Sequence, residues 1–284
     1  MTKLPIVSVG MPVYNGESTL ASAIESILSQ TFSDLELIIS DNASTDKTEE
    51  ICRDYAARDS RIRYIRQPTN SGPENNFKYV LDQSVGQYFM WAADDDTRTP
   101  GFIEANLGIL EANADIVFSS SPNCFMGQET KVKKHKSFEL RGTLYQRFIG
   151  FLDVGLISHG CFYSLMRRDV IKDVPDLSTP FLAWDWILIL YMLLNGNFAR
   201  CEGELLIIDQ TGTCFQEDFL KKMRKRHIEL LFPFFEFSIR FIDLVKDADE
   251  LSFYEKVLVI LKIVKFNFAF ILTHLIPKAL KFIR

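Results

Sequence analysis

The sequence is poor in cysteine and lacks the spacings through which cysteine usually acts. Its five cysteines are far apart, and no C-x-x-C pair occurs among the 284 residues. Neither a zinc ribbon nor a disulfide framework is therefore indicated, and we expect a reducing, cytoplasmic setting. The first residues, MTKLPIVSVGMPVYN, hold only a short apolar stretch, which Pro5, Gly10 and Pro12 interrupt. No small-residue cleavage site follows it, which argues against a signal peptide.

Two common nucleotide-binding motifs are also missing. No G-x-G-x-x-G follows the first expected strand, and no G-x-x-x-x-G-K-[ST] occurs anywhere, which argues against dinucleotide-binding and P-loop proteins. The net charge is −5, yet residues 218–284 hold 13 Lys+Arg and 8 Asp+Glu. The rest of the chain is strongly acidic and has no basic stripe, so nucleic acid is not an expected partner. The basic segment is expected to have a partner of its own or to be a solvated helical surface.

Apolar strands and amphipathic helices alternate along the first 120 residues. We expect strands there at residues 6–11, 35–40, 61–65, 88–93 and 114–119, and one further strand at residues 205–209. This alternation predicts an α/β fold, with a Rossmann-like, mostly parallel sheet flanked by helices and a C-terminal helical appendage. Polar residues follow three of these strands: Tyr14-Asn15 in an expected turn over residues 12–16, Asp41, and Asp94 to Asp96. Such sheets bind ligands at the carboxyl ends of their strands, so we expect a site there.

Three successive carboxylates, Asp94, Asp95 and Asp96, follow the fourth strand. Adjacent like charges repel each other, and aspartates in a loop usually form a solvated turn or cap a helix. A hard divalent cation would neutralise three in a row. Mg²⁺ or Mn²⁺ takes oxygen ligands, often one or two carboxylates together with phosphates of the substrate. The triplet therefore favours a metal–diphosphate site.

Four segments in this order resemble the family 2 glycosyltransferases of GT-A fold. They are VSVGMPVYNGESTLASAIESILSQTFSDLELIISDNASTDKT, NSGPENN, ADDDTRTPGFIE and AWDWILILYMLLNGN. The resemblance extends from about Val7 to Thr213. It implies an inverting, nucleotide-sugar-dependent enzyme whose GT-A domain spans residues 1–217. Residues 1–120 would form its nucleotide-sugar half and residues 121–217 its acceptor half.

The resemblance also implies roles for individual residues. It places six residues at the nucleotide: Pro12, Val13, Tyr14, Asn15, Asp41 and Asp94. It places Asp95 and Asp96 at the metal. The family pattern often reads Asp-x-Asp-Asp, and Ala93 stands at the first of these places. The division of metal, ribose and water contacts among the three acids therefore stays open.

Asp185 matches the family's catalytic base, although Trp184 precedes it where the family commonly has Glu. A free aspartate is a weak base, and burial among Trp184, Trp186 and aliphatic residues should raise its pKa. Without the resemblance, a helix cap with no catalytic task would be the preferred interpretation of Asp185, because aspartate is a common cap. His159 and Trp184 are expected on the acceptor side. The Gln-x-x-Arg-Trp motif of processive relatives is absent at residues 210–213, which favours transfer of one sugar per encounter.

The C-terminal region, residues 218–284, contains a 20-residue apolar stretch from Val257 to Ile276. That length could span a bilayer, but Lys262 and Lys265 lie inside it, and each would cost about 2.5–3.5 kcal/mol near the membrane centre. A helix that lies in the membrane interface therefore fits better than one that crosses. The alternatives are a packed helical subdomain and a homodimer interface.

Together these features predict a metal-dependent, non-processive glycosyltransferase. Its expected donor is a nucleoside-diphosphate sugar, with UDP favoured by the resemblance, and its expected acceptor is a hydroxyl of a glycan or lipid-linked molecule in cell-surface polysaccharide synthesis. It would act as a peripheral protein on the inner face of the cell membrane. Two alternatives are a nucleotidyltransferase acting on sugar phosphates and a non-catalytic nucleotide-sugar-binding protein. The nucleotidyltransferase would release pyrophosphate, whereas the binding protein would release no product.

Overall fold

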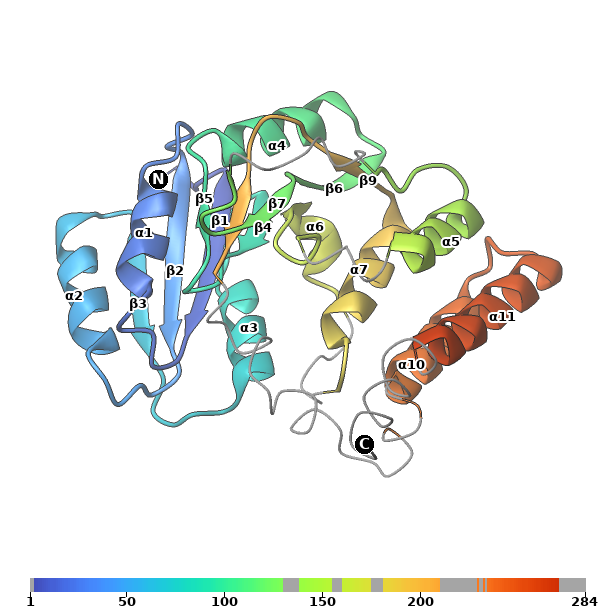
Figure 1. Cartoon of the computed structure of the whole chain (residues 1–284). Helices are drawn as coiled ribbons and strands as arrows, with labels where there is room; N and C mark the ends of the chain where they lie inside the picture. Colours follow the sequence, from blue (N-terminus) through green and yellow to red (C-terminus); the bar gives the residue numbers. More distant parts are fainter. Residues whose placement is uncertain are drawn as a thin grey trace.

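A seven-stranded sheet forms the centre of the protein (Figure 1). The computed structural model describes residues 3–129, 138–154, 160–174, 181–209, 229, 232 and 234–270. In spatial order the sheet comprises β3 (Ile62–Arg66), β2 (Leu35–Asp41), β1 (Val7–Val13), β4 (Tyr88–Trp91), β8 (Leu165–Arg167), β6 (Ile116–Ser120) and β9 (Asn197–Arg200). Strand β8 is antiparallel to both of its neighbours, and the other pairs are parallel. The expected mostly parallel sheet is confirmed.

The register of the central strands sets the position of the polar loops. Val13, the last residue of β1, lies beside Asp41, the last residue of β2. Strand β4 runs parallel to β1 and ends at Trp91, opposite Gly10. The loops after these three strands therefore emerge at the same edge of the sheet. The expected turn at residues 12–16 begins later than predicted, because Pro12 and Val13 are buried and continue the pairing with β2.

Helices cover both faces of the sheet. They are α1 (Leu20–Leu28), α2 (Thr48–Arg58), α3 (Pro73–Asp82), α4 (Phe102–Ala112), α5 (Leu144–Val154), α6 (Arg168–Ile171) and α7 (Trp184–Asn195). Side chains alternate between two hydrophobic cores along β4: Phe89 and Trp91 enter one core, and Tyr88 and Met90 the other. Because both faces are covered, all seven residues of β1 are buried, as is typical of parallel sheets.

A second, three-stranded sheet contacts helix α1. Its order is β5 (Thr97–Arg98), β10 (Leu206–Ile208) and β7 (Asn123–Phe125). Strand β10 is antiparallel to β5 and parallel to β7. Only the strand at Leu205 to Asp209 is expected from the sequence, because two- and three-residue strands depend on distant partners. This sheet brings the end of β10 next to the acidic triplet that precedes β5.

Two C-terminal helices, α10 (Phe235–Asp247) and α11 (Phe253–Phe270), pack beside α7 and α5 (Figure 1). The Trp186 ring of α7 stacks on Phe234 at 5.6 Å and meets the edges of Phe237 and Phe266. In the described parts of the chain, no helix has the length and apolar character needed to cross a membrane. Helix α11 covers the first part of the expected apolar stretch, and residues 271–276 lie outside the described residues.

Candidate active site

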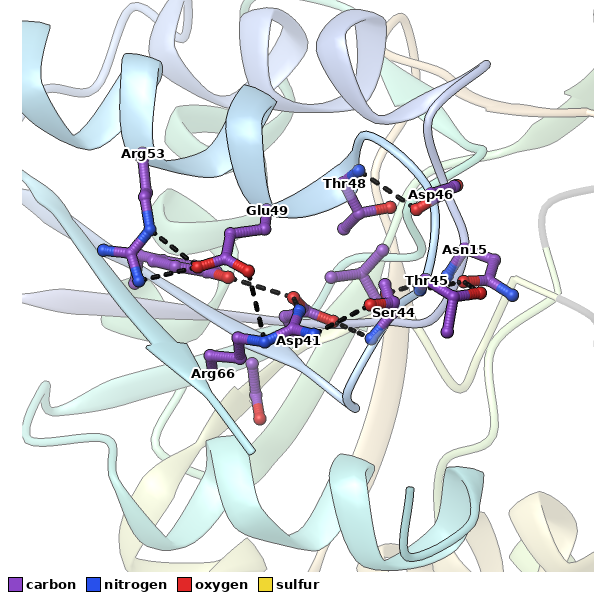
Figure 2. Close-up of polar contacts among 12 residues, drawn as sticks. Asn15, Asp41, Ser44, Thr45, Asp46, Thr48, Glu49, Arg53 and Arg66 are labelled. Carbon is purple, nitrogen blue, oxygen red and sulfur yellow. Dashed lines mark hydrogen bonds and ion pairs between the residues drawn. The ribbon is translucent and has the colours of Figure 1, made fainter. Parts of the chain in front are cut away.

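The loops after β1 and β2 are tied together by their own polar groups. The Asn15 backbone N–H donates to Ser44 Oγ at 2.9 Å, and Asn15 Oδ1 accepts from the Thr45 backbone N–H at 2.8 Å (Figure 2). The Gly16 N–H donates to Thr48 Oγ1 at 2.9 Å. These bonds fix the loop that carries Tyr14, whose ring remains exposed. An exposed aromatic ring beside a rigid loop can stack on a flat ligand such as a nucleotide base.

Asp41 is completely buried, and three donors hold its carboxylate. Oδ1 accepts from the Ser44 backbone N–H at 2.8 Å, and Oδ2 accepts from the Tyr64 hydroxyl at 2.9 Å and from Arg66 Nη1 at 2.6 Å (Figure 2). Arg66 also contacts Glu49, with 3.2 Å between Nε and Oε2. Burial raises the pKa of Tyr64, and its bond to Asp41 raises it further. The carboxylate is therefore fixed in place before any ligand binds.

Tyr64 and Arg66 belong to the site but were not predicted from the sequence. They lie two residues apart in β3 and so face the same side of the sheet. In the parallel register, Arg66 pairs with Asp41 and Tyr64 with Ile39. The alternation of charged and apolar residues in β3 was a signal that this face is polar, but only the register shows which acid it meets.

The acidic triplet lies directly against the loop after β1. A Cβ atom on Gly16 would be 2.5 Å from Asp94 Oδ2 and 2.8 Å from Val13 Cγ2. A side chain at residue 16 would therefore displace the Asp94 carboxylate. The structure thus brings together the segments after β1, β2 and β4, which hold the residues expected at the nucleotide and the metal.

The carboxyl groups of the triplet lose their protons less readily than a free aspartate does. Burial raises the pKa of Asp94 to about 7 and that of Asp96 to about 7, and the charge of Asp95 adds to both shifts. The pKa of Asp95 is also raised, first by burial and then by the charge of Asp209. Asp96 Oδ1 accepts a hydrogen bond from the Asp209 backbone N–H at 3.0 Å. Asp209 is a fourth acid that sequence analysis missed, although its place after the apolar run of β10 was a signal.

Arg98 provides a positive charge behind these acids. Its guanidinium group is buried and donates one hydrogen bond, from Nη2 to the Trp91 carbonyl oxygen at 2.9 Å, while Nε and Nη1 have no hydrogen-bond partner. It lies 5.4 Å from the Phe102 ring centroid and 6.0 Å from that of Tyr163. Burial lowers the pKa of Arg98 to about 10, and the charge of Asp96 opposes this shift. One buried cation is too little to offset several neighbouring acids.

The residues present fit a divalent cation whose ligands come partly from the protein and partly from a substrate. Among the described residues, no three His, Cys, Asp or Glu side chains converge into a complete metal cage. Mg²⁺ and related cations do not need one where substrate phosphates and water complete the coordination. The raised pKa values of Asp94 and Asp96 show that negative charge at this position lacks compensation, and a cation would supply it.

Asp185 lies in the first turn of α7. Burial raises its pKa to about 6, although the backbone N–H groups of Asp185 and Trp186 act in the opposite direction. Trp184 beside it packs against Phe77 at 5.7 Å and Phe162 at 5.3 Å between ring centroids. A carboxylate with this pKa is mostly ionised at neutral pH and is a stronger base than an ordinary aspartate.

Three non-glycine residues in the described ranges have a positive φ: Asn15 (55°), Ala43 (60°) and Ala183 (66°). Asn15 and Ala43 lie in the loops after β1 and β2, and Ala183 immediately precedes α7. Left-handed backbone is unfavourable for alanine, and such strain concentrates at functional sites. All three lie in segments that the sequence marks as part of the site.

Tyr163 connects the two halves of the site. Burial raises the pKa of its phenol well above the ordinary value, and the charges of Asp96, Asp95 and Asp185 raise it further. Its hydroxyl is therefore protonated, and no hydrogen bond to it is found among the described residues. Tyr163 was not predicted from the sequence, because the turn before β8 contains no recognisable motif. His159, expected on the acceptor side, lies outside the described residues.

Comparison with known proteins identifies the family. Residues 8–174 match the model of "Glycosyl transferase family 2". The putative glycosyltransferase EpsE of Bacillus subtilis is 42% identical over 112 residues, which cover 39% of this chain and 40% of that protein. The GalNAc(5)-diNAcBac-PP-undecaprenol beta-1,3-glucosyltransferase of Campylobacter jejuni is 33% identical over 172 residues, which cover 60% and 54%. The aligned regions thus span about half the length of these relatives or less.

The fold is also similar to that of a solved structure. Residues 1–349 of S. aureus TarS, in complex with UDP-GlcNAc, superpose with a TM-score of 0.67 and 18% identity over 93% of this chain and 73% of that one. The fold is thus of the GT-A type, as the sequence predicted. The chain belongs to glycosyl transferase family 2.

Proposed function

We propose that this protein transfers a sugar from a UDP-sugar to a hydroxyl of a glycan or lipid-linked acceptor, with inversion at the anomeric carbon. The observation that carries the proposal is the position of the acidic triplet, packed on the Gly16 loop next to the Asp41 network. TarS supports UDP as the nucleotide, since its structure holds UDP-GlcNAc. The Campylobacter relative supports a lipid-linked acceptor, since its name gives an undecaprenol-linked one.

In this proposal the residues of the sheet edge hold the donor. Tyr14 stacks on the base, Asp41 and the neighbouring Pro12, Val13 and Asn15 backbone position the nucleoside, and Asp94 contacts the ribose. Asp95 and Asp96 would hold Mn²⁺ or Mg²⁺ with the diphosphate. The cation supplies charge compensation for the departing diphosphate.

Asp185 acts on the acceptor in this proposal. Its ionised carboxylate removes the proton from the acceptor hydroxyl. The acceptor oxygen forms a bond to the anomeric carbon from the face opposite the diphosphate, while the bond from that carbon to the phosphate oxygen breaks. UDP leaves with the electron pair, and the proton stays on Asp185. Trp184 and His159 would contact the acceptor.

The wider setting follows from this chemistry. We assign donor binding to residues 1–120, acceptor binding to residues 121–217 and attachment to a surface to residues 218–284. One sugar is transferred per encounter. A lipid-linked acceptor in cell-surface polysaccharide synthesis places the protein at the inner face of the membrane as a peripheral enzyme.

Two measurements test the proposal: donor binding and the identity of the released product. The protein is incubated with a panel of UDP-, GDP- and dTDP-sugars, with and without Mn²⁺, and stabilisation by ligand is read as a rise in melting temperature. Hydrolysis or transfer from the stabilising donor should release a nucleoside diphosphate. Release of pyrophosphate would instead indicate a nucleotidyltransferase, and binding without any turnover would indicate a non-catalytic binding protein.

A further inference from the structure

Helix α11 has an apolar side that the described residues leave largely exposed, with one contact at its end, where the Phe232 ring lies 6.0 Å from that of Phe268. On one side, Val259 and Ile263 are buried against the body of the protein. On the other, five side chains remain exposed and form what we call the α11 outer face: Tyr254, Val257, Leu261, Val264 and Phe268. Their spacing of three and four residues places them in one continuous stripe along the helix. Figure 1 shows α11 at the edge of the molecule, on the side away from the sheet.

The stripe is too apolar to be an ordinary solvent-facing surface. Surface helices normally present charged and polar residues to water, and helices that are apolar all round are usually covered. The exposed charge beside the stripe is that of Lys265, since Lys262 forms an ion pair with Asp153 at 2.5 Å and Lys256 donates to the Lys246 carbonyl oxygen. Contiguous exposed apolar surface of this kind marks an interaction site.

The charge around the helices indicates what the stripe meets. Residues 234–270 hold five basic and six acidic residues, so the positive excess of the C-terminal region lies on both sides of them in the sequence. KKMRKRH at residues 221–227 precedes the helices, and Lys278, Lys281 and Arg284 follow them. An apolar stripe between basic clusters is complementary to an anionic lipid surface, which offers acyl chains below negative headgroups.

A second copy of the chain fits the stripe less well. From Tyr254 to Phe268 it covers about two heptads, whereas a coiled coil needs about three or four. A specific interface buries about 800 Å² on each partner, more than a single short helical stripe is expected to provide. A lipid surface has no such requirement, because it accepts any apolar face that can sink into it.

We propose that the α11 outer face lies on an anionic membrane surface and attaches the enzyme there. The inference rests on the proposed function only in that a lipid-linked acceptor gives the attachment a purpose. Helices α10 and α11 pack on α7, whose first turn carries Asp185. Attachment through α11 would therefore hold the candidate base at a fixed position relative to the membrane that carries the acceptor.

Matched variants of the full-length protein test the proposal. Leu261 and Val264 are 59% and 45% exposed, and Leu4 and Val85, at the opposite, N-terminal edge of the sheet, are 63% and 41% exposed. The double substitutions Leu261→Glu/Val264→Glu and Leu4→Glu/Val85→Glu thus add the same charge at closely similar exposure. Vesicles of phosphatidylglycerol and phosphatidylcholine, and of phosphatidylcholine alone, are sedimented with each protein, and melting curves check that each is folded.

Wild-type protein should sediment with the anionic vesicles. The α11 double variant should bind them about tenfold more weakly or worse, and the Leu4/Val85 variant within about twofold of wild type. Equal binding by all three proteins would overturn the proposal. So would a wild-type dimer, measured by light scattering, that the α11 variant alone dissociates without loss of vesicle binding. UDP binding, measured on the same samples, tests the proposed function separately, because the outer face is not part of the nucleotide site.

Discussion

The pH dependence of turnover offers a detailed test of Asp185 as the base. Burial raises its pKa from 3.8 to about 6, and a base must be ionised to accept a proton. Turnover at saturating substrate should therefore be level above pH 7, about half-maximal near pH 6 and about a tenth of maximal at pH 5. An aspartate of ordinary pKa would hold the plateau down to about pH 5. The measurement is the initial rate of UDP release under saturating Mn²⁺, so that titration of Asp94 and Asp96 does not contribute.

The substitution Asp185→Asn completes the test. Asparagine keeps the shape of the side chain but cannot accept the proton, so kcat should fall by about 10²- to 10⁴-fold. Affinity for UDP should stay within about twofold, because Asp185 is assigned to the acceptor and not to the nucleotide. A variant that keeps more than a tenth of wild-type turnover, or a wild-type plateau that continues unchanged to pH 5, would refute the reasoning.

Three further predictions concern the donor side. Asp94 and Asp96 have folded-state pKa values near 7, above the value of 3.8 for a free aspartate, so their contribution to stability is present below about pH 4 and lost as the pH rises to 7. The melting temperature of metal-free protein should fall over that range, and saturating Mn²⁺ should restore it at pH 7; no response to Mn²⁺ would count against the site. Arg66→Met should weaken UDP binding about tenfold because Asp41 loses its strongest donor. Arg53→Met is its control, because Arg53 pairs with Glu49 and lies 5.4 Å from the Tyr64 ring centroid but makes no bond to Asp41, and it should change little; equal losses would contradict the role of Arg66. Tyr163→Phe keeps the ring and removes the hydroxyl, so affinity for the UDP-sugar or kcat should fall about two- to tenfold while UDP affinity stays constant, and a parallel loss of UDP affinity would contradict this placement.

Much of the first half of the fold could be predicted from local pattern. The strands at residues 35–40 and 61–65 were placed within one residue because each is a short apolar or alternating run between turn signals. Their parallel arrangement followed from the intervening helices. It led directly to the expectation that Tyr14, Asp41 and the acidic triplet share one edge of the sheet.

The parts that could not be predicted depend on pairing between distant segments. Strand β8 lies antiparallel between β4 and β6, and nothing in LMR indicates either neighbour. The short sheet of β5, β10 and β7 places Asp209 beside Asp96 across more than 100 residues of sequence. Arg66 and Tyr163 escaped notice for the same reason, because their roles come from register and packing and not from a motif.

Calorimetric titration of UDP into the protein, with and without Mn²⁺, tests the central claim most directly. The claim is that the triplet at the end of β4 binds the diphosphate through a divalent cation. UDP should bind at least about tenfold more tightly with Mn²⁺ than without it, and Asp95→Asn should abolish the difference. UDP affinity that is the same with and without the metal, in a folded wild-type protein, would contradict the account.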